Sequence, residues 1–321
     1  MVLPALDLQK GTLSISQEME RGRGEAFPPP GAIIGFMSPK QIGIVTDSTC
    51  DIPQGLIDQY GIIVQPHVVV WGAEQLRDRV DIQADAFYRR LVSDPVMPTT
   101  SQATIADFAG AYRRAVEQGA EEILAVIVSG ALSGAIQSAT QAKEFVDVPV
   151  HIHDSRGATM GLGWQVLAAA RVRDAGGGVV EMIAAAEAAR KRMQLFILLD
   201  TLEYVYRGGR IGNASRLVGT MLNVKPMIAL DHESGIVEPM GLAMTRRRGL
   251  DTLVQKFFAC MEPGRPTHVA VLHGDAEADA LALEQRVREE YHPAELVTTI
   301  TCPILGIHTG PHAIALCGYS E

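Results

Sequence analysis

The sequence predicts an α/β protein with two domains, an N-terminal domain on a parallel sheet and a C-terminal α+β domain with a mixed or antiparallel sheet. First, short apolar runs, such as those at residues 42–45 and 122–128, alternate with helical segments. Such alternation is typical of parallel strands joined by right-handed crossovers. Second, two apolar runs are separated only by Asp231-His232-Glu233-Ser234-Gly235, which indicates an antiparallel hairpin. Third, a length of 321 residues suits two domains of ~100–200 residues each, which we place at residues 41–163 and 164–321.

Residues 1–40 lie outside both predicted domains. They contain the run Pro28-Pro29-Pro30 and the polar stretch 17–24, and no apolar period of 2 or 3.6 residues persists in them. They also lack the basic start, apolar core and small-residue cleavage site of a secretory signal. We therefore expect a disordered tail or a start codon assigned too far upstream.

The composition argues against several classes of function. A net charge of −9 gives no reason to expect nucleic acid or an anionic membrane as a partner, and an aromatic content of 5% disfavours base stacking. No uninterrupted apolar run reaches the ~18–20 residues that a membrane span requires. The cysteines have no CxxC spacing, so we expect buried thiols in a reducing, cytoplasmic compartment, with neither disulfides nor a zinc site. They are Cys50, Cys260, Cys302 and Cys317.

The predicted N-terminal domain begins with the strand at residues 42–45, which stops at the polar turn Thr46-Asp47-Ser48-Thr49. Asp51 then has the pattern of a helix N-cap. Pro66 predicts a bend or an edge position in the next strand, and Asp81 is the expected cap of the second helix. The predicted order is helix 53–60, strand 62–70, loop 71–80, helix 84–92, helix 105–118 opened by the hydroxyl-rich segment 98–102, strand 122–128, a helix ending at Phe145, and strand 148–152.

The predicted C-terminal domain starts with two alanine-rich helices and contains the hairpin. In the run Tyr206-Arg207-Gly208-Gly209-Arg210, the glycine pair forces a turn that presents Arg210. A later helix, from about Ala276 to Tyr291, repeats apolar residues at 3.6-residue spacing. The predicted elements are helices 164–175 and 179–192, strand 195–199, helix 214–222, strands 226–230 and 236–242, helix 249–260, strand 268–272, and strands 296–301 and 313–317 around the glycine-rich loop 306–311.

Three strands of the predicted parallel sheet end in hydroxyl-bearing turns, at Ser48, Ser133 and Ser155. A fourth hydroxyl-rich group, at residues 99–101, is expected to open a helix. The carboxyl ends of parallel strands share one edge of a sheet, where helix N-termini supply N–H groups and partial positive charge. This convergence predicts a ligand site at that edge.

Ser101 and Ser133 are the strongest candidates for contact with an anionic head group. A hydroxyl pair with helix N–H groups can hold a carboxylate without a full counter-charge. The alternative is that each serine only caps its own helix, which contributes ~1 kcal/mol. His308, in a glycine-rich loop, could donate a hydrogen bond to the anion, orient a serine, or only bond to the backbone. The Gly-Pro pair before His312 rules out a helix that would make the two histidines joint metal ligands, so no metal site is predicted.

Arg207, Arg210 and the run Arg246-Arg247-Arg248 form the notable basic grouping on this acidic chain. They predict contact with an anionic partner surface or a phosphate, unless they form only solvated turns with local salt bridges.

Asp47 beside Ser48 is compatible with a phosphotransfer aspartate or an activated nucleophile. However, Thr49 stands where a second carboxylate is expected, and neither a Gly-x-Ser-x-Gly elbow nor a Walker loop occurs. A nucleophilic enzyme is therefore weakly supported.

Six motifs, each weak alone, together resemble the DegV family. They occur in the family's order and span nearly everything from residue 41 onward. They are Val-Thr-Asp-Ser-Thr-Cys-Asp-Ile-Pro (45–53), Thr-Ser-Gln (100–102), Leu-Ser-Gly-Ala-Ile-Gln-Ser-Ala (132–139), Tyr-Arg-Gly-Gly-Arg-Ile (206–211), Lys-Pro-Met-Ile (225–228) and Gly-Ile-His-Thr-Gly-Pro (306–311). The chain departs from the family pattern at Ala135-Ile136, where Thr-Tyr is usual, and at His312, where glycine is usual.

The resemblance implies a two-domain protein that buries one long-chain fatty acid between its domains, without a cofactor or catalytic activity of its own. In relatives that work with a fatty acid kinase, the bound carboxylate is presented to that separate kinase for phosphorylation, which implies a role in phospholipid metabolism. The residues implied to bind the carboxylate are Thr100, Ser101, Ser133, Gly134 and His308. Arg207 and Arg210 are implied to face the partner.

We therefore expect a monomeric, cytoplasmic fatty-acid-binding protein. The alternative from another class is an enzyme that acts on a small anionic substrate at the same strand-end cleft, with Asp47, Ser133 or His308 catalytic. A third hypothesis is a binding module for a different amphiphile. A small polar ligand requires a wet pocket, whereas a fatty acid requires a dry tunnel lined by apolar side chains, so the lining of the cavity discriminates between them.

Overall fold

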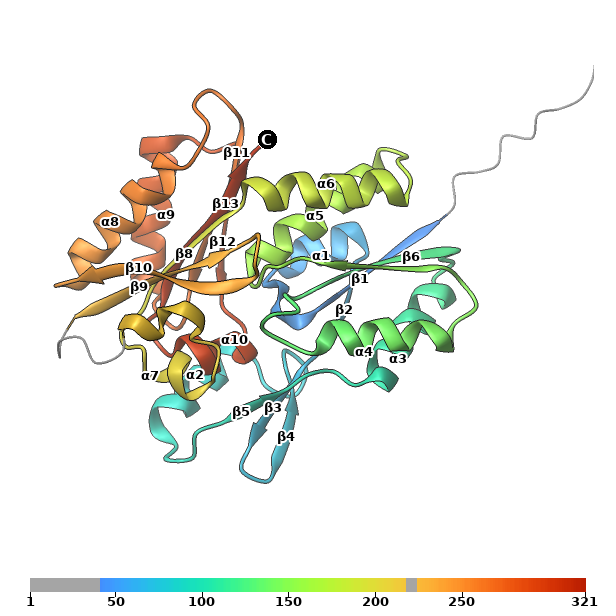
Figure 1. Ribbon diagram of the computed structural model, residues 1–321, viewed down its shortest axis with the longest axis horizontal. Helices are drawn as coiled ribbons and strands as arrows, with labels where there is room; N and C mark the ends of the chain where they lie inside the picture. The colour runs from blue at the N-terminus through green and yellow to red at the C-terminus, as the bar shows by residue number, and fades with distance from the viewer. Residues whose placement is uncertain (1–40, 218–223) are drawn as a thin grey trace, which may run out of the picture. The chain divides into compact units, whose positions relative to one another are not determined.

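The computed structural model describes residues 41–217 and 224–321 (Figure 1). Its first sheet is entirely parallel, with the strand order β2-β1-β6-β7. The strands are β1 (Ile42–Asp47), β2 (Ile63–Gln65), β6 (Glu122–Ile127) and β7 (Val150–Asp154). The two central strands are almost entirely buried and rich in aliphatic residues, as expected for a sheet covered on both faces. The predicted parallel sheet is confirmed.

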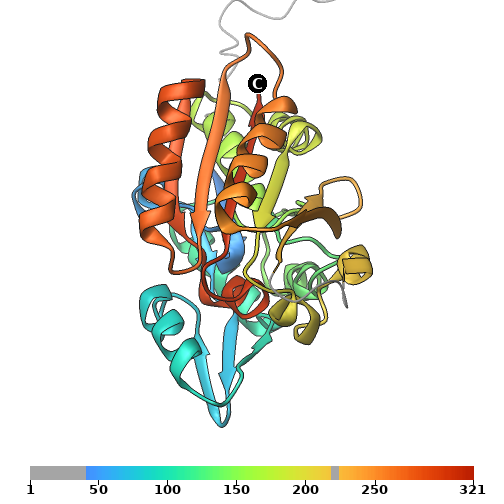
Figure 2. The ribbon, with the colours of Figure 1, turned by 90° about the vertical axis from the view of Figure 1, so that its left-hand side faces the viewer.

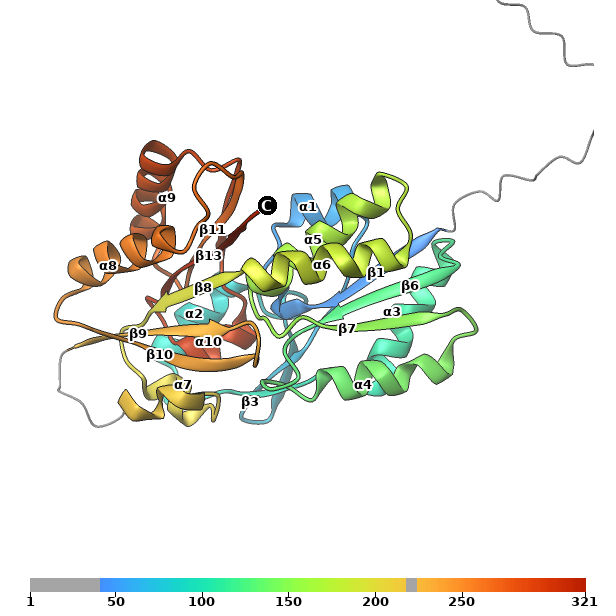
Figure 3. The ribbon, with the colours of Figure 1, turned by 45° about the horizontal axis from the view of Figure 1, so that its top comes forward.

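Helices cover both faces of this first sheet. Figure 3 shows α1, α5 and α6 on one side of the strands and α3 and α4 on the other. A capping box between Thr104 and Asp107 begins α3, and its buried face carries Phe108 and Tyr112. The helices are α1 (Gln54–Tyr60), α3 (Ile105–Glu117), α4 (Ala135–Gln141), the 3₁₀ segment η2 (Ala142–Phe145), α5 (Met160–Asp174) and α6 (Val179–Arg192).

The second sheet is mixed, with the strand order β10-β9-β8-β13-β11-β12. All neighbouring strands are antiparallel except β11 and β12, so the predicted mixed sheet and its hairpin are confirmed. The helices α8 and α9 pack on one face, where Phe257 and Val287 meet Val271 and Leu316. The elements are β8 (Gln194–Leu198), β9 (Lys225–Asp231), β10 (Ile236–Ala243), α8 (Arg246–Ala259), β11 (Thr267–His273), α9 (Glu277–Tyr291), β12 (Glu295–Ile300) and β13 (Ile314–Ser320).

Helix α5 packs against both sheets. It contacts β1 and β6, and its Trp164 Nε1 donates a hydrogen bond to the carbonyl oxygen of Cys317 on β13 at 3.3 Å. The domain boundary predicted between residues 163 and 164 would fall inside this helix. The division into two domains stays a prediction.

A small antiparallel sheet, with the order β4-β3-β5, corrects three expectations. Pro66 separates the predicted strand 62–70 into β2 and β3 (Val68–Trp71), which belong to different sheets. The predicted loop 71–80 contains β4 (Glu74–Arg77), and the hydroxyl-rich segment forms β5 (Thr99–Ser101) and does not open a helix. Figure 2 shows this sheet beside α2 (Ala84–Ser93), next to α10 (Pro303–Thr309).

Several local expectations were wrong. His308 lies in α10, where a loop was predicted, and α8 begins at Arg246 because Thr245 accepts a hydrogen bond from Arg248 N. Asp51 is no N-cap but a left-handed residue with φ 49° after the 3₁₀ segment η1 (Ser48–Cys50). Gln83, not Asp81, is the N-cap of α2. Three cysteines are buried as expected, whereas Cys260 is exposed.

Part of the predicted helix 214–222 lies outside the described residues; its beginning belongs to the 3₁₀ segment η3 (Gly212–Leu217), after the short helix α7 (Glu203–Arg207). Within the described ranges, no helix is long and apolar enough to cross a membrane.

Candidate functional site

A cavity of about 370 Å³ lies between the carboxyl edge of the parallel sheet, the second sheet and α10. Its apolar wall is the face of the second sheet opposite α8 and α9. Ala315 of the central strand β13 pairs with Ile197 on one side and Leu272 on the other, so the three side chains point to the same face. Because Ala315 is the smallest of the three, it forms the floor of a groove between two larger side chains. The apolar side chains of this wall are Leu195, Ile197, Ile228, Leu230, Val237, Leu272, Ala313 and Ala315.

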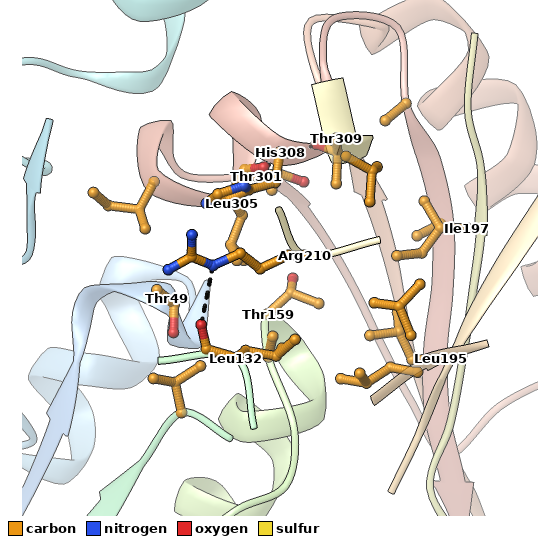
Figure 4. Close-up of a pocket in the computed structure, with 18 of the residues that line it drawn as sticks. Thr49, Leu132, Thr159, Leu195, Ile197, Arg210, Thr301, Leu305, His308 and Thr309 are labelled. Carbon is orange, nitrogen blue, oxygen red and sulfur yellow. Dashed lines mark hydrogen bonds between the residues drawn. The ribbon is translucent and has the colours of Figure 1, made fainter. Parts of the chain in front are cut away.

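The opposite part of the cavity carries its polar side chains, among the apolar residues Val128, Leu132, Ala158, Val205, Ile304 and Leu305. Figure 4 shows Thr49 and Leu132 on one side and Leu195 and Ile197 on the other, with Arg210 extending between α10 and Leu132. The polar residues follow the ends of β1, β6 and β12, or come from β5, the start of α5, α10, the connection between β2 and β3, and the turn after α7. They are Thr49, His67, Thr100, Ser101, Gln102, Ser133, Thr159, Arg210, Thr301, His308 and Thr309.

Two of the hydroxyl groups that line the cavity already donate hydrogen bonds to buried carboxylates of the protein. Thr49 Oγ1 donates to Asp47 Oδ1 at 2.5 Å, and Thr159 Oγ1 donates to Asp51 Oδ2 at 2.6 Å. Because a hydroxyl carries a single proton, neither group can also donate to an anion in the cavity.

Ser101 and Ser133 keep their protons available. Ser133 Oγ accepts from Ala135 N at 3.1 Å, so the capping interpretation holds for this serine, but its proton is free. Ser101 lies in β5 and makes no side-chain hydrogen bond within the described residues, so it caps no helix. Both can donate to an anion.

Gly134 does not line the cavity. A Cβ there would lie 2.5 Å from Gln102 Oε1, so the absence of a side chain at Gly134 leaves room for the Gln102 side chain.

His308 is held against the glycine turn of the motif at residues 206–211. A Cβ on Gly208 would overlap His308 Nδ1, and a Cβ on Gly310 would overlap the ring of Tyr204. The two motifs therefore interlock through α7 and α10. Burial, and next the guanidinium of Arg210, lower the pKa of His308 to about 4, so the imidazole is neutral at pH 7. Its buried Nδ1 has no hydrogen-bond partner among the described residues.

We expect Gly208→Ala to lower the free energy of unfolding by about 1–3 kcal/mol, because the added methyl group overlaps the imidazole. Gly208 has φ −72°, which any residue adopts, so the effect is steric. Gly209→Ala is the matched control, since Gly209 has φ +70° and its built Cβ meets no atom within 4 Å. Denaturant unfolding of each variant with and without His308→Ala should show coupling for Gly208 and none for Gly209. Equal coupling at both positions would contradict the interlock.

The two predicted partner-facing arginines differ in position. Arg207 is exposed and pairs with Glu203 at 2.7 Å. Arg210 lines the cavity, where its Nε donates to Leu132 O at 3.2 Å and its Nη1 donates to Gly208 O at 2.8 Å. Arg210 therefore brings positive charge to the polar end of the cavity, which the motif alone did not predict.

Asp47 and His67 form a buried pair below the polar end. Asp47 Oδ1 accepts from the amide and hydroxyl of Thr49, and Oδ2 accepts from Val128 N at 2.8 Å. His67 Nδ1 accepts from Ala103 N, so a neutral imidazole carries its proton on Nε2, 3.4 Å from Asp47 Oδ1. Burial alone would raise the pKa of Asp47, but His67 and the hydrogen bonds outweigh burial and lower it. The Asp47 carboxylate is therefore fully used within the protein, whereas His67 lines the cavity and its Nε2 has no hydrogen-bond partner among the described residues.

The remaining candidates lie outside the cavity. Ser48 Oγ accepts from His67 N, and the Ser155 hydroxyl hydrogen-bonds only with Gly157; neither serine lines the cavity. Sequence reasoning missed His67, Thr159 and Thr301, because each reaches the cavity through contacts distant in sequence. Within residues 41–217 and 224–321, no group of three or more His, Cys, Asp or Glu side chains could hold a metal ion.

Comparisons with known proteins agree over the same part of the chain. A family model described as "Uncharacterised protein, DegV family" matches residues 41–321. A DegV domain-containing protein of Streptomyces coelicolor is 36% identical over 274 residues, which cover 85% of this chain and 96% of the relative. Protein DegV of Bacillus subtilis is 26% identical over 278 residues, covering 86% and 98%.

Two solved structures are also similar. One is a DegV family protein from Thermus thermophilus described as binding fatty acid, with a TM-score of 0.82, 32% identity and coverage of 88% of this chain and 100% of that chain. The other is DegV of Bacillus subtilis, described as a fatty acid binding protein, with a TM-score of 0.81, 25% identity and coverage of 88% and 100%. The chain described here belongs to the DegV family.

Proposed function

We propose that this protein binds one long-chain fatty acid in the cavity, with the acyl chain on the apolar face of the second sheet and the carboxylate at the polar end. The observation that carries the proposal is the pairing of an apolar groove over β13 with two free hydroxyl donors at the opposite end. Each buried CH₂ contributes ~0.8 kcal/mol, so a long acyl chain has a large driving force to enter such a groove. The fatty acid binding described for the Thermus thermophilus relative supports the same ligand class.

In this proposal Ser101 and Ser133 donate hydrogen bonds to the carboxylate, and Thr100 completes the site, while Gly134 leaves room for the Gln102 side chain. His308, neutral at pH 7, supports the polar network. The guanidinium of Arg210 supplies the nearby positive charge that two hydroxyl groups lack.

We further propose that the protein has no catalytic activity of its own, and that it is a cytoplasmic monomer that presents the carboxylate to a separate fatty acid kinase, as an early step of phospholipid metabolism. Arg207 and the exposed part of Arg210 would face that partner, because they lie on the turn that borders the polar end.

The enzyme hypothesis has less support. Both oxygens of Asp47 accept hydrogen bonds from the protein, which leaves the carboxylate unavailable as a nucleophile or base. His308 has no hydrogen-bonded carboxylate within the described residues, so nothing orients it as a general base. The apolar second-sheet wall also suits an acyl chain better than a small polar anion.

The test is native mass spectrometry of the purified protein, followed by mass spectrometry of its organic extract. We expect a bound mass that matches a fatty acid. Ser101→Ala combined with Ser133→Ala should weaken affinity by at least about a hundredfold, because each of the two charge-assisted hydrogen bonds contributes ~1.5–3 kcal/mol. The control is Ser93→Ala with Ser215→Ala, two exposed serines away from the cavity, which should retain the ligand. A protein that stays empty when offered C14 to C20 acids would contradict the proposal.

A further inference from the structure

The β9–β10 hairpin forms one wall of the cavity. Ile228 and Leu230 of β9 and Val237 of β10 line the cavity. Among the strands of the second sheet that line it, only β10 lies at an edge of the sheet, and its pairing with β9 is irregular between Pro239 and Gly241. The other lining strands are paired on both sides, whereas β10 is paired with β9 alone.

The turn of the hairpin is fastened to the parallel-sheet side by three side chains. Each donates to a backbone carbonyl of the turn: Ser129 Oγ to Gly235 O at 3.0 Å, Arg156 Nη1 to Glu233 O at 2.6 Å, and Arg190 Nη1 to His232 O. Figures 1 and 3 show the turn reaching the region where α5 begins.

The shape of the turn does not depend on these three contacts. The Asp231 carboxylate accepts hydrogen bonds from Glu233 N, Ser234 N and Ser234 Oγ, all within the turn. The turn therefore has internal hydrogen bonds of its own, independent of the three contacts to the parallel-sheet side.

His232 seats the turn on α5. Its ring is buried, and a Cβ on Gly161 would lie only 2.7 Å from His232 Nε2. That nitrogen has no hydrogen-bond partner among the described residues, so the ring contacts α5 by van der Waals packing and not by a hydrogen bond.

Ser129 links the hairpin to the turn that carries Ser133. Its carbonyl oxygen accepts from Leu132 N at 3.0 Å and from Ser133 N at 3.1 Å, while its Oγ accepts from Ala131 N at 3.2 Å. The same Oγ donates to Gly235 O, so one residue both builds the head-group turn and holds the hairpin closed.

We propose that the β9–β10 hairpin is the gate through which the ligand enters and leaves, and that Ser129 is a positioning residue that couples closure of this gate to the head-group turn. The inference rests on the proposed fatty acid binding. The turn at residues 231–235 lies beyond the part of β9 that pairs with β8, Met227–Ala229, so a chain cannot pass under the turn until the three hydrogen bonds of the turn break.

A reversible cross-link tests the gate. A Cβ at position 235 would lie 3.3 Å from Ser129 Cβ, close to the ~3.5–4.5 Å spacing of a disulfide, so Ser129→Cys with Gly235→Cys should form one on oxidation. Cys260→Ser removes the exposed native thiol. The protein is loaded with palmitic acid, and exchange against ¹³C-palmitic acid is followed by native mass spectrometry. We expect oxidation to slow exchange at least tenfold and dithiothreitol to restore it.

A single substitution tests Ser129 without strain at Gly235, whose φ is +72°. Ser129→Ala should speed both uptake and release of palmitic acid about tenfold. The dissociation constant should stay nearly unchanged, because loss of the hydrogen bond to Gly235 raises both rate constants by the same factor. Loss of a head-group contact or of stability would instead change affinity. The control is Ser234→Ala, whose hydroxyl bonds only within the turn and which should exchange at the wild-type rate.

The outcomes separate the two proposals. Palmitic acid that is bound but exchanges equally fast in the oxidised and reduced proteins would overturn the gate alone, as would a Ser129→Ala variant with wild-type rates. A protein that takes up no palmitic acid in any variant would overturn the proposed function and the gate with it.

Discussion

Replacing Asp51 with alanine is expected to lower the free energy of unfolding by about 3–5 kcal/mol, because it leaves a partner charge and two further donors unpaired. Asp51 is fully buried. Its Oδ1 accepts from Arg79 Nη2 at 2.7 Å and from Cys302 N at 2.9 Å, and its Oδ2 accepts from Thr159 Oγ1 at 2.6 Å. One carboxylate thus joins three segments, and two of them place Thr159 and Thr301 in the cavity.

Denaturant unfolding measures this change. The matched control is Asp58→Ala, an exposed aspartate that bonds only to Gln54 of its own helix and should change stability by less than about 0.5 kcal/mol. Asp51→Asn separates charge from conformation, because asparagine also tolerates the left-handed backbone at φ 49°. A value within about 1 kcal/mol of wild type for Asp51→Ala would show that the three donors find other partners.

The sheet types could be predicted because their signals are local. Apolar runs flanked by amphipathic helices indicated the parallel sheet, and a five-residue polar turn indicated the β9–β10 hairpin. β4 was missed because Glu74–Arg77 is polar and mostly exposed, so no apolar alternation marks it. α10 was missed because Gly306 and Thr309 disfavour helix; the helix is instead fixed by packing, with Gly306 placed against the ring of Tyr88.

The candidate site was predictable only where a motif carries it. Ser101, Ser133 and His308 were found from motifs and line one cavity. The role of Asp51 could not be found in this way, because its pattern as a cap is local whereas its partner Cys302 lies 251 residues further on. The sequence also cannot show which hydroxyl groups can still donate to a ligand. Thr49 and Ser133 are equivalent in the sequence, but in the structure only Thr49 donates its proton to another side chain.

The largest effect on ligand binding is expected from Ala315→Phe. Ala315 is on the floor of the apolar groove, between Ile197 and Leu272. A phenyl ring brings about six carbon atoms into the groove and excludes a similar number of methylene groups; at ~0.8 kcal/mol each, the affinity for palmitic acid should fall by about a thousandfold or more. Competition binding against a fluorescent fatty acid measures this change.

Two controls separate filling of the groove from damage to the fold. Capric acid has a shorter chain and should bind Ala315→Phe with nearly wild-type affinity, which an unfolded protein cannot do. Leu316→Phe changes the next residue, whose side chain packs with α8 and α9 on the opposite face, so it should lower stability without discriminating between the two acids. Ala315→Phe with wild-type affinity for palmitic acid would place the acyl chain elsewhere, because a ligand lying along β13 cannot share its floor with a phenyl ring.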